Sequence, residues 1–272
     1  MRILFAAQRR ALCYQRRMDA MFDLLGAPQL AAALAIGMLA GVIKGMVGFA
    51  MPMVLVSGLS TFLAPELALA GLILPTLVTN GMQALRQGPA AALASVARFR
   101  VFLLVGLVFL LGSAQLVAVL PMSVLLLMIG VPITGFALMQ LLGLGFRLAV
   151  QSPRVEAAVG AFAGFIGGMS GVWGPPTVAY LTALDTPKAE QMRVQGVIYG
   201  LGAVALMVAH VGSGVLRAET LPLSLALVVP AVLGMRLGQR FHDRVDQATF
   251  RKATLLVLTL AGLNLIRRGL IA

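Results

Sequence analysis

Two segments of the chain combine glycine with proline inside otherwise apolar sequence. Residues 41–53 read GVIKGMVGFAMPM and residues 164–176 read GFIGGMSGVWGPP, and the two align as G-x-x-x-G-M-x-G-x-x-x-P. Backbone that leaves a helix inside a lipid bilayer must be buried in protein or line a cavity, because lipid cannot hydrogen-bond to it. Two matching breaks therefore indicate a binding site between two related halves of the chain.

The chemistry available at such a break is the binding of an anion. A helix that begins there presents free N–H groups and the positive end of its dipole. Pro52 and Pro175 suit the start of a helix, where a missing N–H costs nothing, and we expect short helices to run from Met53 and Pro176. Pro176 removes a second donor, which the Thr177 hydroxyl can replace. The alternative is that the glycines are packing contacts between helices.

Further polar side chains lie in or beside the breaks. Ser170 belongs to the second break, and Trp173 can donate its indole N–H there, although a tryptophan can also anchor a helix at the membrane interface. Lys44 stands beside the first break. Its ammonium group could bind an anion, because a charge inside the membrane is costly and usually functional, or its side chain could extend to a cytoplasmic interface.

Amides and hydroxyls recur on one face of a later segment in each half. Thr76, Asn80 and Gln83 follow the three-and-four spacing of a helix face. Gln195 and Tyr199 do the same in the second half. Such groups suit an anion that must be bound and then released, or they could join helices by hydrogen bonds. The candidate substrate-binding residues are Lys44, Gly48, Phe49, Met51, Pro52, Asn80, Gln83, Ser170, Gly171, Trp173, Gly174, Pro175, Thr177, Gln195 and Tyr199.

The composition is that of a membrane protein. Hydrophobic residues make up 60% of the chain and charged residues 11%, and the mean hydropathy is +0.98. Soluble domains are about a quarter charged. Crossing the bilayer takes about 20 apolar residues in a helix. Uncharged runs lie at 67–85, 101–120, 122–146 and 194–216, at 45–65 and 157–184 with the breaks inside them, and in shorter form at 28–43, 220–235 and 253–266.

The basic residues indicate topology. They produce the net charge of +12 but are scattered among short connections, which argues against nucleic acid as a partner. The connections at 86–100, 146–155 and 236–252 hold ten basic residues against two acidic ones, so all three should face the cytoplasm. Keeping the last two on one side requires an even number of crossings between them. The stretch at 175–184, and by analogy that at 52–63, must then be a separate short element.

This division gives five elements in each half, and an odd number places the halves in opposite orientations. We expect an all-α integral membrane protein, an inverted-repeat transporter with eight long transmembrane helices and two short broken or re-entrant half-helices. The repeats span 28–150 and 151–272, after an N-terminal basic extension at 1–27 that forms an interfacial helix unless translation starts at Met21. The alternative is eight conventional spans in which both breaks are kinks.

Other classes of function lack the residues that they need. An enzyme requires a nucleophile with a base, or a metal cluster, whereas the chain offers one cysteine, Cys13, and two distant histidines, His210 and His242. We expect no catalytic residue, no metal site and no cofactor. No carboxylate falls in the middle of an expected membrane span, which disfavours cation transport and carboxylate-based proton coupling.

Several segments resemble the sulfite exporter TauE/SafE family. They are the glycine-rich break followed by proline, LRQG at 85–88, EQMR at 190–193, and GMRLGQRFHDRVDQATFRKATLLVLTLAGLNLI at 234–266. The similarity covers residues 28–271. It implies a bacterial inner-membrane permease for small sulfur-containing or organic anions, such as sulfite or sulfoacetate.

The direction of transport follows from electrostatics. An anion that leaves a cell with a negative interior gains about 2.3 kcal/mol per charge for each 100 mV, so export needs no coupling ion. We expect a secondary exporter of a small anionic substrate that works by alternating access in the lipid bilayer, and two copies could form a homodimer. The alternative is a permease for other small organic carboxylates, with or without proton coupling.

Overall fold

The computed structural model describes residues 26–63, 65–114, 121–144, 148, 150–170, 174–212 and 219–271, and these residues form helices without any strand. The expected all-α class is thus confirmed. In chain order the helices are α2 (Ala27–Val47), α3 (Met51–Leu59), α4 (Pro65–Leu85), α5 (Pro89–Arg98), α6 (Arg100–Ala114), α7 (Met122–Leu141), α8 (Pro153–Ser170), α9 (Gly174–Ala183), α10 (Lys188–Gly212), α11 (Leu221–Arg244) and α12 (Gln247–Ile271).

Three of the described helices, α2, α11 and α12, are long and apolar enough to cross a membrane. A fourth span results if α5 and α6, which are bent by 73° relative to each other, count as one. Length and apolarity thus identify three or four of the eight crossings that the sequence predicts. Helix α5 is itself a correction, because it lies in the expected connection at 86–100. Its proline at the first turn and its alanines favour a helix there.

Both short elements exist, and each follows a long helix from which the chain turns back. Gly58 of α3 packs against the side chain of Ile36 in α2, so α3 returns along α2. The Leu148 N–H, just before α8, donates to the Ala183 carbonyl at the end of α9 at 2.8 Å. With 9 and 10 residues, these helices extend only about 15 Å. They begin at Met51 and Gly174, two residues earlier than the sequence suggested.

The backbone of the first break is left-handed at two positions. Gly48 ends α2 with a φ of 87°, and its N–H donates to the Lys44 carbonyl at 2.7 Å. Glycine is the residue that adopts this conformation without strain. Ala50, directly before α3, also has a positive φ of 71°, although it carries a side chain. The break is therefore a defined reversal of direction and not a kink in one helix.

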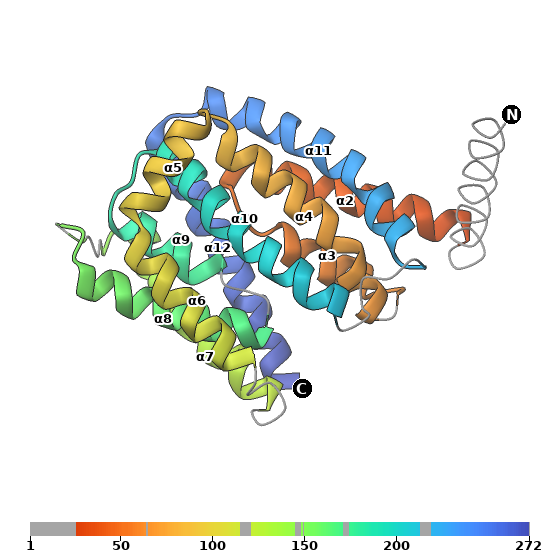
Figure 1. Ribbon diagram of the computed structural model, residues 1–272, viewed down its shortest axis with the longest axis horizontal. Coiled ribbons are helices and arrows are strands. Elements are labelled where there is room, and N and C mark those ends of the chain that lie inside the picture. The colour runs from red at the N-terminus through yellow and green to blue at the C-terminus, as the bar shows by residue number, and fades with distance from the viewer. Residues whose placement is uncertain are drawn as a thin grey trace, which may run out of the picture.

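Glycines bring α2 and α11 into close contact, and likewise α6 and α8 (Figure 1). A methyl group on Gly41 would overlap the Ala231 carbonyl, and one on Gly45 would overlap that of Met235, so α2 and α11 run parallel. Gly164 packs in the same way on Gly106, one turn after Gly160 packs on Phe102, so α6 and α8 also run parallel. Such small-residue contacts are typical of membrane helices.

Two further pairs of helices run antiparallel. Gly196 of α10 lies against Ala84 of α4, and Gly200, one turn later, lies beside Asn80, one turn earlier. In the other pair, Gly130 of α7 packs on Gly262 of α12, and Gly269 of α12 packs on Ser123 of α7. In Figure 1, α10 lies between the group of α2, α4 and α11 and the group of α6, α7 and α8.

The described parts of the three basic connections meet at one end of the molecule, which we call the basic end. Arg86 forms an ion pair with Asp243 at 2.6 Å. Arg98 donates from Nε to the Gln151 side chain at 2.9 Å. The first connection therefore touches both of the others, as expected for connections on one side of a membrane. Helices α4 and α11 end here, and α8 and α10 begin here.

Proline inside α4 leaves a backbone carbonyl without its helical hydrogen bond, and α11 supplies a donor for it. Pro75 has no N–H to donate to the carbonyl of Gly71, four residues earlier. Ser224, which is fully buried in α11, donates its hydroxyl to that carbonyl at 3.3 Å and accepts the N–H of Leu74 at 3.1 Å. A polar side chain from a neighbouring helix thus replaces the water that lipid excludes.

We expect Ser224→Ala to destabilise the protein by about 1–3 kcal/mol, the cost of leaving a buried backbone group unpaired. The melting temperature of the detergent-solubilised protein measures this. Ser57→Ala, at an exposed position of α3, is the control and should leave it unchanged. An equal loss in both variants would contradict the role assigned to Ser224.

Gly48→Ala should lower the melting temperature, because a side chain in the left-handed region costs about 1–2 kcal/mol and the new methyl group would also overlap Gln195. Gly81→Ala is the matched control on α4, where a methyl group meets open space. That change should be neutral or stabilising by up to about 1 kcal/mol through helix propensity. A Gly48→Ala protein as stable as the wild type would refute the break geometry.

Candidate functional site

Helix α10 joins the two breaks. With its amide nitrogen facing the acceptors, Gln195 donates to the carbonyls of Val47 at 3.2 Å and Gly48 at 3.0 Å in the first break. Tyr199 donates its hydroxyl to the carbonyl of Gly174 at 3.0 Å in the second. The two side chains stand four residues apart on one helix, a separation of about 6 Å along its axis. Segments more than 120 positions apart in the sequence are thus bonded to side chains that stand one helical turn apart on α10.

Helix α4 also donates a hydrogen bond to the first break. Gln83 donates its amide nitrogen to the Gly48 carbonyl at 3.1 Å and to the Met192 carbonyl at 2.7 Å. The Gly48 carbonyl therefore receives amide donors from both α4 and α10. Gln83 is 1% exposed and Gln195 is completely buried. These amides form hydrogen bonds between helices, as in the alternative that the sequence left open for them. The bonds lie at the break itself.

Lys44 is buried one turn before the break, at 1% exposure. Its Nζ donates to Oδ1 of Asn80 on α4. The side chain therefore does not extend to a membrane interface, and that alternative is wrong. Within the described part of the chain, no carboxylate lies within ion-pair distance of Lys44. A buried charge without a counter-ion is costly, so this position favours the arrival of an anion.

The start of α3 contributes backbone donors beside this lysine. Phe49 and Met51 are buried, and Pro52 is the second residue of the helix. No side chain caps the N-terminus of α3, where the first turn of any helix leaves N–H groups free. Thr79 of α4 donates its hydroxyl to the sulfur of Met51 at 3.3 Å and, more closely, to the Pro75 carbonyl at 2.6 Å.

The second break is described in part. Pro175 and Thr177 are buried in the first turns of α9, and the hydroxyl of Thr177 interacts with that of Tyr199. Ser170 ends α8. Gly171 and Trp173 lie outside the described residues, as does almost all of the N-terminal extension at 1–27. The predicted residues that are described lie on α2, α3, α4, α8, α9 and α10 and on the link between α2 and α3.

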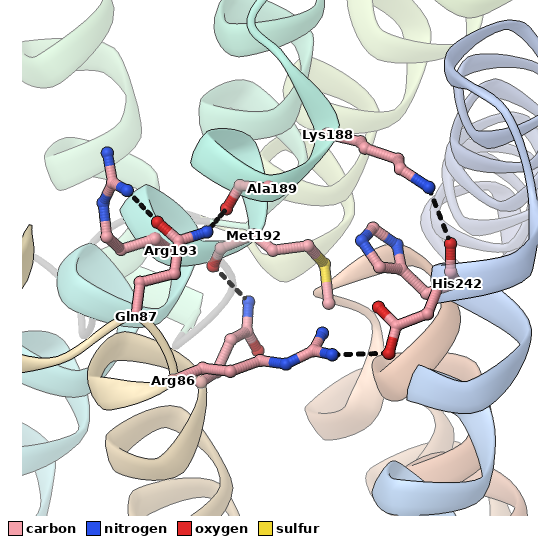
Figure 2. A pocket seen from close by; sticks show the side chains of 9 residues that line it. Arg86, Gln87, Lys188, Ala189, Met192, Arg193 and His242 are labelled. Atoms are coloured by element: carbon pink, nitrogen blue, oxygen red, sulfur yellow. Dashed lines mark hydrogen bonds and ion pairs between the residues drawn. The ribbon is translucent and has the colours of Figure 1, made fainter.

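A cavity of about 320 Å³ opens between α4, α10 and α11 at the basic end (Figure 2). We call it the vestibule. Gln83 lines it and also bonds to the first break. The remaining lining residues come from the end of α4, the start of α10 and the end of α11; they are Arg86, Gln87, Lys188, Ala189, Met192, Arg193, His242 and Asp243.

The sequence prediction included only Gln83 of these residues. Arg193 also lies 3.8 Å from Glu190 on the same helix. The basic residues were recognisable as topology markers. Their convergence on one cavity was not, because it depends on how three helices from two halves of the chain end together.

Buried acidic groups in the described residues serve the fold. Glu156 is 3% exposed and accepts the N–H of Phe102 at 3.0 Å, in the first turn of α6. Gln151 donates to its second oxygen at 2.7 Å. The carboxylate thus caps a helix whose own terminus lacks acidic residues. No group of three or more metal-ligating side chains occurs among the residues described.

The chain was compared with known proteins. No match to it is found among the curated proteins or among the solved structures. The family model for the sulfite exporter TauE/SafE matches residues 33–265, which is most of the chain. Together with the apolar helices, this match indicates a membrane transporter. The chain belongs to the sulfite exporter TauE/SafE family.

Proposed function

We propose that the protein is a secondary transporter that moves small sulfur-containing oxyanions, such as sulfite or sulfoacetate, across the bacterial inner membrane. The anion binds between the starts of α3 and α9, beside Lys44. The observation that carries this proposal is the pair of hydrogen bonds from α10. Gln195 and Tyr199, one helical turn apart on α10, each bond to one break, which supports a single ligand between the two helix starts.

The charges at this position favour an oxyanion. Lys44 is buried against Asn80 and lacks a carboxylate partner among the described residues. Thr76, one turn before Asn80, is 7% exposed, and no described group partners its hydroxyl oxygen. An ammonium group, a hydroxyl and the free N–H groups of a helix start all donate hydrogen bonds, which suits a ligand made of acceptors.

The helix pairs support an inverted repeat with halves at 28–150 and 151–272. In this repeat, α2 corresponds to α8, and α11 corresponds to α6. The parallel pair α2 with α11 therefore corresponds to the parallel pair α8 with α6. The pairs α4 with α10 and α7 with α12 each map onto themselves, and both run antiparallel. Equivalent helices that run antiparallel have opposite orientations in the membrane, which is the basis of alternating access in such transporters.

Lys44→Met tests the site. Because the variant removes a buried charge, we expect the protein to stay folded and to show a smaller rise in melting temperature with sulfite or sulfoacetate than the wild type does. Lys252→Met, at an exposed position of α12, is the control and should keep the full rise. Carboxylates are included in the panel, because their oxygens offer the same acceptors. A Lys44→Met protein that responds like the wild type would remove Lys44 from the site.

Export is tested in vesicles loaded with sulfite. A membrane potential that is negative inside should accelerate efflux, because each charge gains about 2.3 kcal/mol per 100 mV. Collapsing the proton gradient at constant potential should have no effect. If flux follows a proton or sodium gradient and ignores the potential, the protein is a coupled permease and the proposed direction is wrong.

A further inference from the structure

The vestibule carries more positive than negative charge. Arg86 and Arg193 face it from α4 and α10, and Lys188 enters from the first turn of α10 (Figure 2). Asp243 is the one carboxylate among the described lining residues. Its ion pair with Arg86 leaves both side chains partly exposed, at 54% and 36%. A cleft that is lined by charges of one sign concentrates ions of the opposite sign.

Neutral groups hold two of the three cations, Lys188 and Arg193, although Arg193 also lies 3.8 Å from Glu190. Lys188 donates to the carbonyls of His242, at 3.0 Å, and Val245. Arg193 donates to the hydroxyl of Ser95 at 2.8 Å and to the amide of Gln87. Because carbonyl, hydroxyl and amide oxygens carry no formal charge, these contacts orient the side chains without neutralising them. With three cations and one carboxylate among its described lining residues, the cavity keeps a net positive charge.

The layer that closes the vestibule on its inner side also covers the first break. Gln83 and Met192 line the cavity, and the same Gln83 amide nitrogen bonds to the carbonyls of Met192 and Gly48. The amide oxygen of Gln83 is buried and has no partner among the described residues. An anion at this layer would offer the Gln83 nitrogen a charged acceptor in place of two carbonyls, and charge-assisted hydrogen bonds are about twice as strong as neutral ones.

We propose that the vestibule is a separate binding site for the oxyanion at the basic end, in series with the break and divided from it by the layer that Gln83 and Met192 form. The inference rests on the proposed function for its role in transport. Binding to the vestibule requires only the cavity and its charges. Cytoplasmic oxyanions would collect there and reach Lys44 when the Gln83 amide turns toward them.

The test separates this site from the break by working in the Lys44→Met protein. Titration calorimetry of this full-length variant with sulfite should still show binding. Adding Arg86→Gln should weaken that binding about tenfold, the lower end of the effect of a charge-lined cleft on local ion concentration. Adding Asp243→Asn should strengthen it. Arg86→Lys should retain it, and Arg240→Gln, an equal charge change at an exposed position outside the vestibule, should leave it unchanged.

Two results would overturn the proposal. The first is no sulfite binding in the Lys44→Met protein, although the wild type binds. The second is that Arg86→Gln and Asp243→Asn change the affinity for sulfite in the same direction, or that neither changes it more than Arg240→Gln does. In vesicles, the Arg86→Gln protein should show a raised KM for sulfite efflux with an unchanged maximal rate. Absence of efflux from wild-type vesicles would refute the transport function, and the binding experiment would still decide the vestibule.

Discussion

Every backbone group that leaves a helix inside lipid must find a partner, and the structure is organised around that requirement. At the first break, the carbonyl of Gly48 receives amide donors from α4 and α10. At the second, Gly174 receives the hydroxyl of Tyr199. At Pro75, a serine from α11 supplies the missing bonds. Polar side chains are therefore placed where the backbone is incomplete, and the same places can bind a ligand.

The helix pairing explains how the two breaks reach each other. The first helix of each half packs against the third long helix of the other half, so neither half folds as a separate bundle. Glycines allow this, because Gly41 and Gly164 bring backbone directly against backbone. The two buried apolar clusters follow the interlocked groups and not the halves. Phe49 and Ala50 of the first break belong to the cluster built largely from α6, α7, α8, α9, α10 and α12.

Charge is distributed in two layers along the axis from the basic end inward. The outer layer contains Arg86, which is paired with Asp243, and Arg193, which donates to the Ser95 hydroxyl; both line the vestibule. The inner layer contains Lys44, buried against Asn80. In the proposed transport, an anion that moves inward exchanges the cations of the vestibule for the buried Lys44, and electrostatic interactions strengthen as the local dielectric constant falls. Between the layers stands an uncharged amide, which can release an anion as readily as it binds one.

The sequence by itself determined the helical class, the membrane environment, the positions of both breaks and their short helices, because composition and the Gly-Pro pattern act locally. It also identified Lys44, Gln83, Gln195 and Tyr199 as polar groups that are costly to place in lipid and are therefore candidates for a binding site. Only the tertiary structure decided their roles. Whether Lys44 extends to the interface or turns inward, and whether Arg86 and Arg193 line one cavity, depends on contacts between helices far apart in the chain. No local preference of the backbone encodes such contacts.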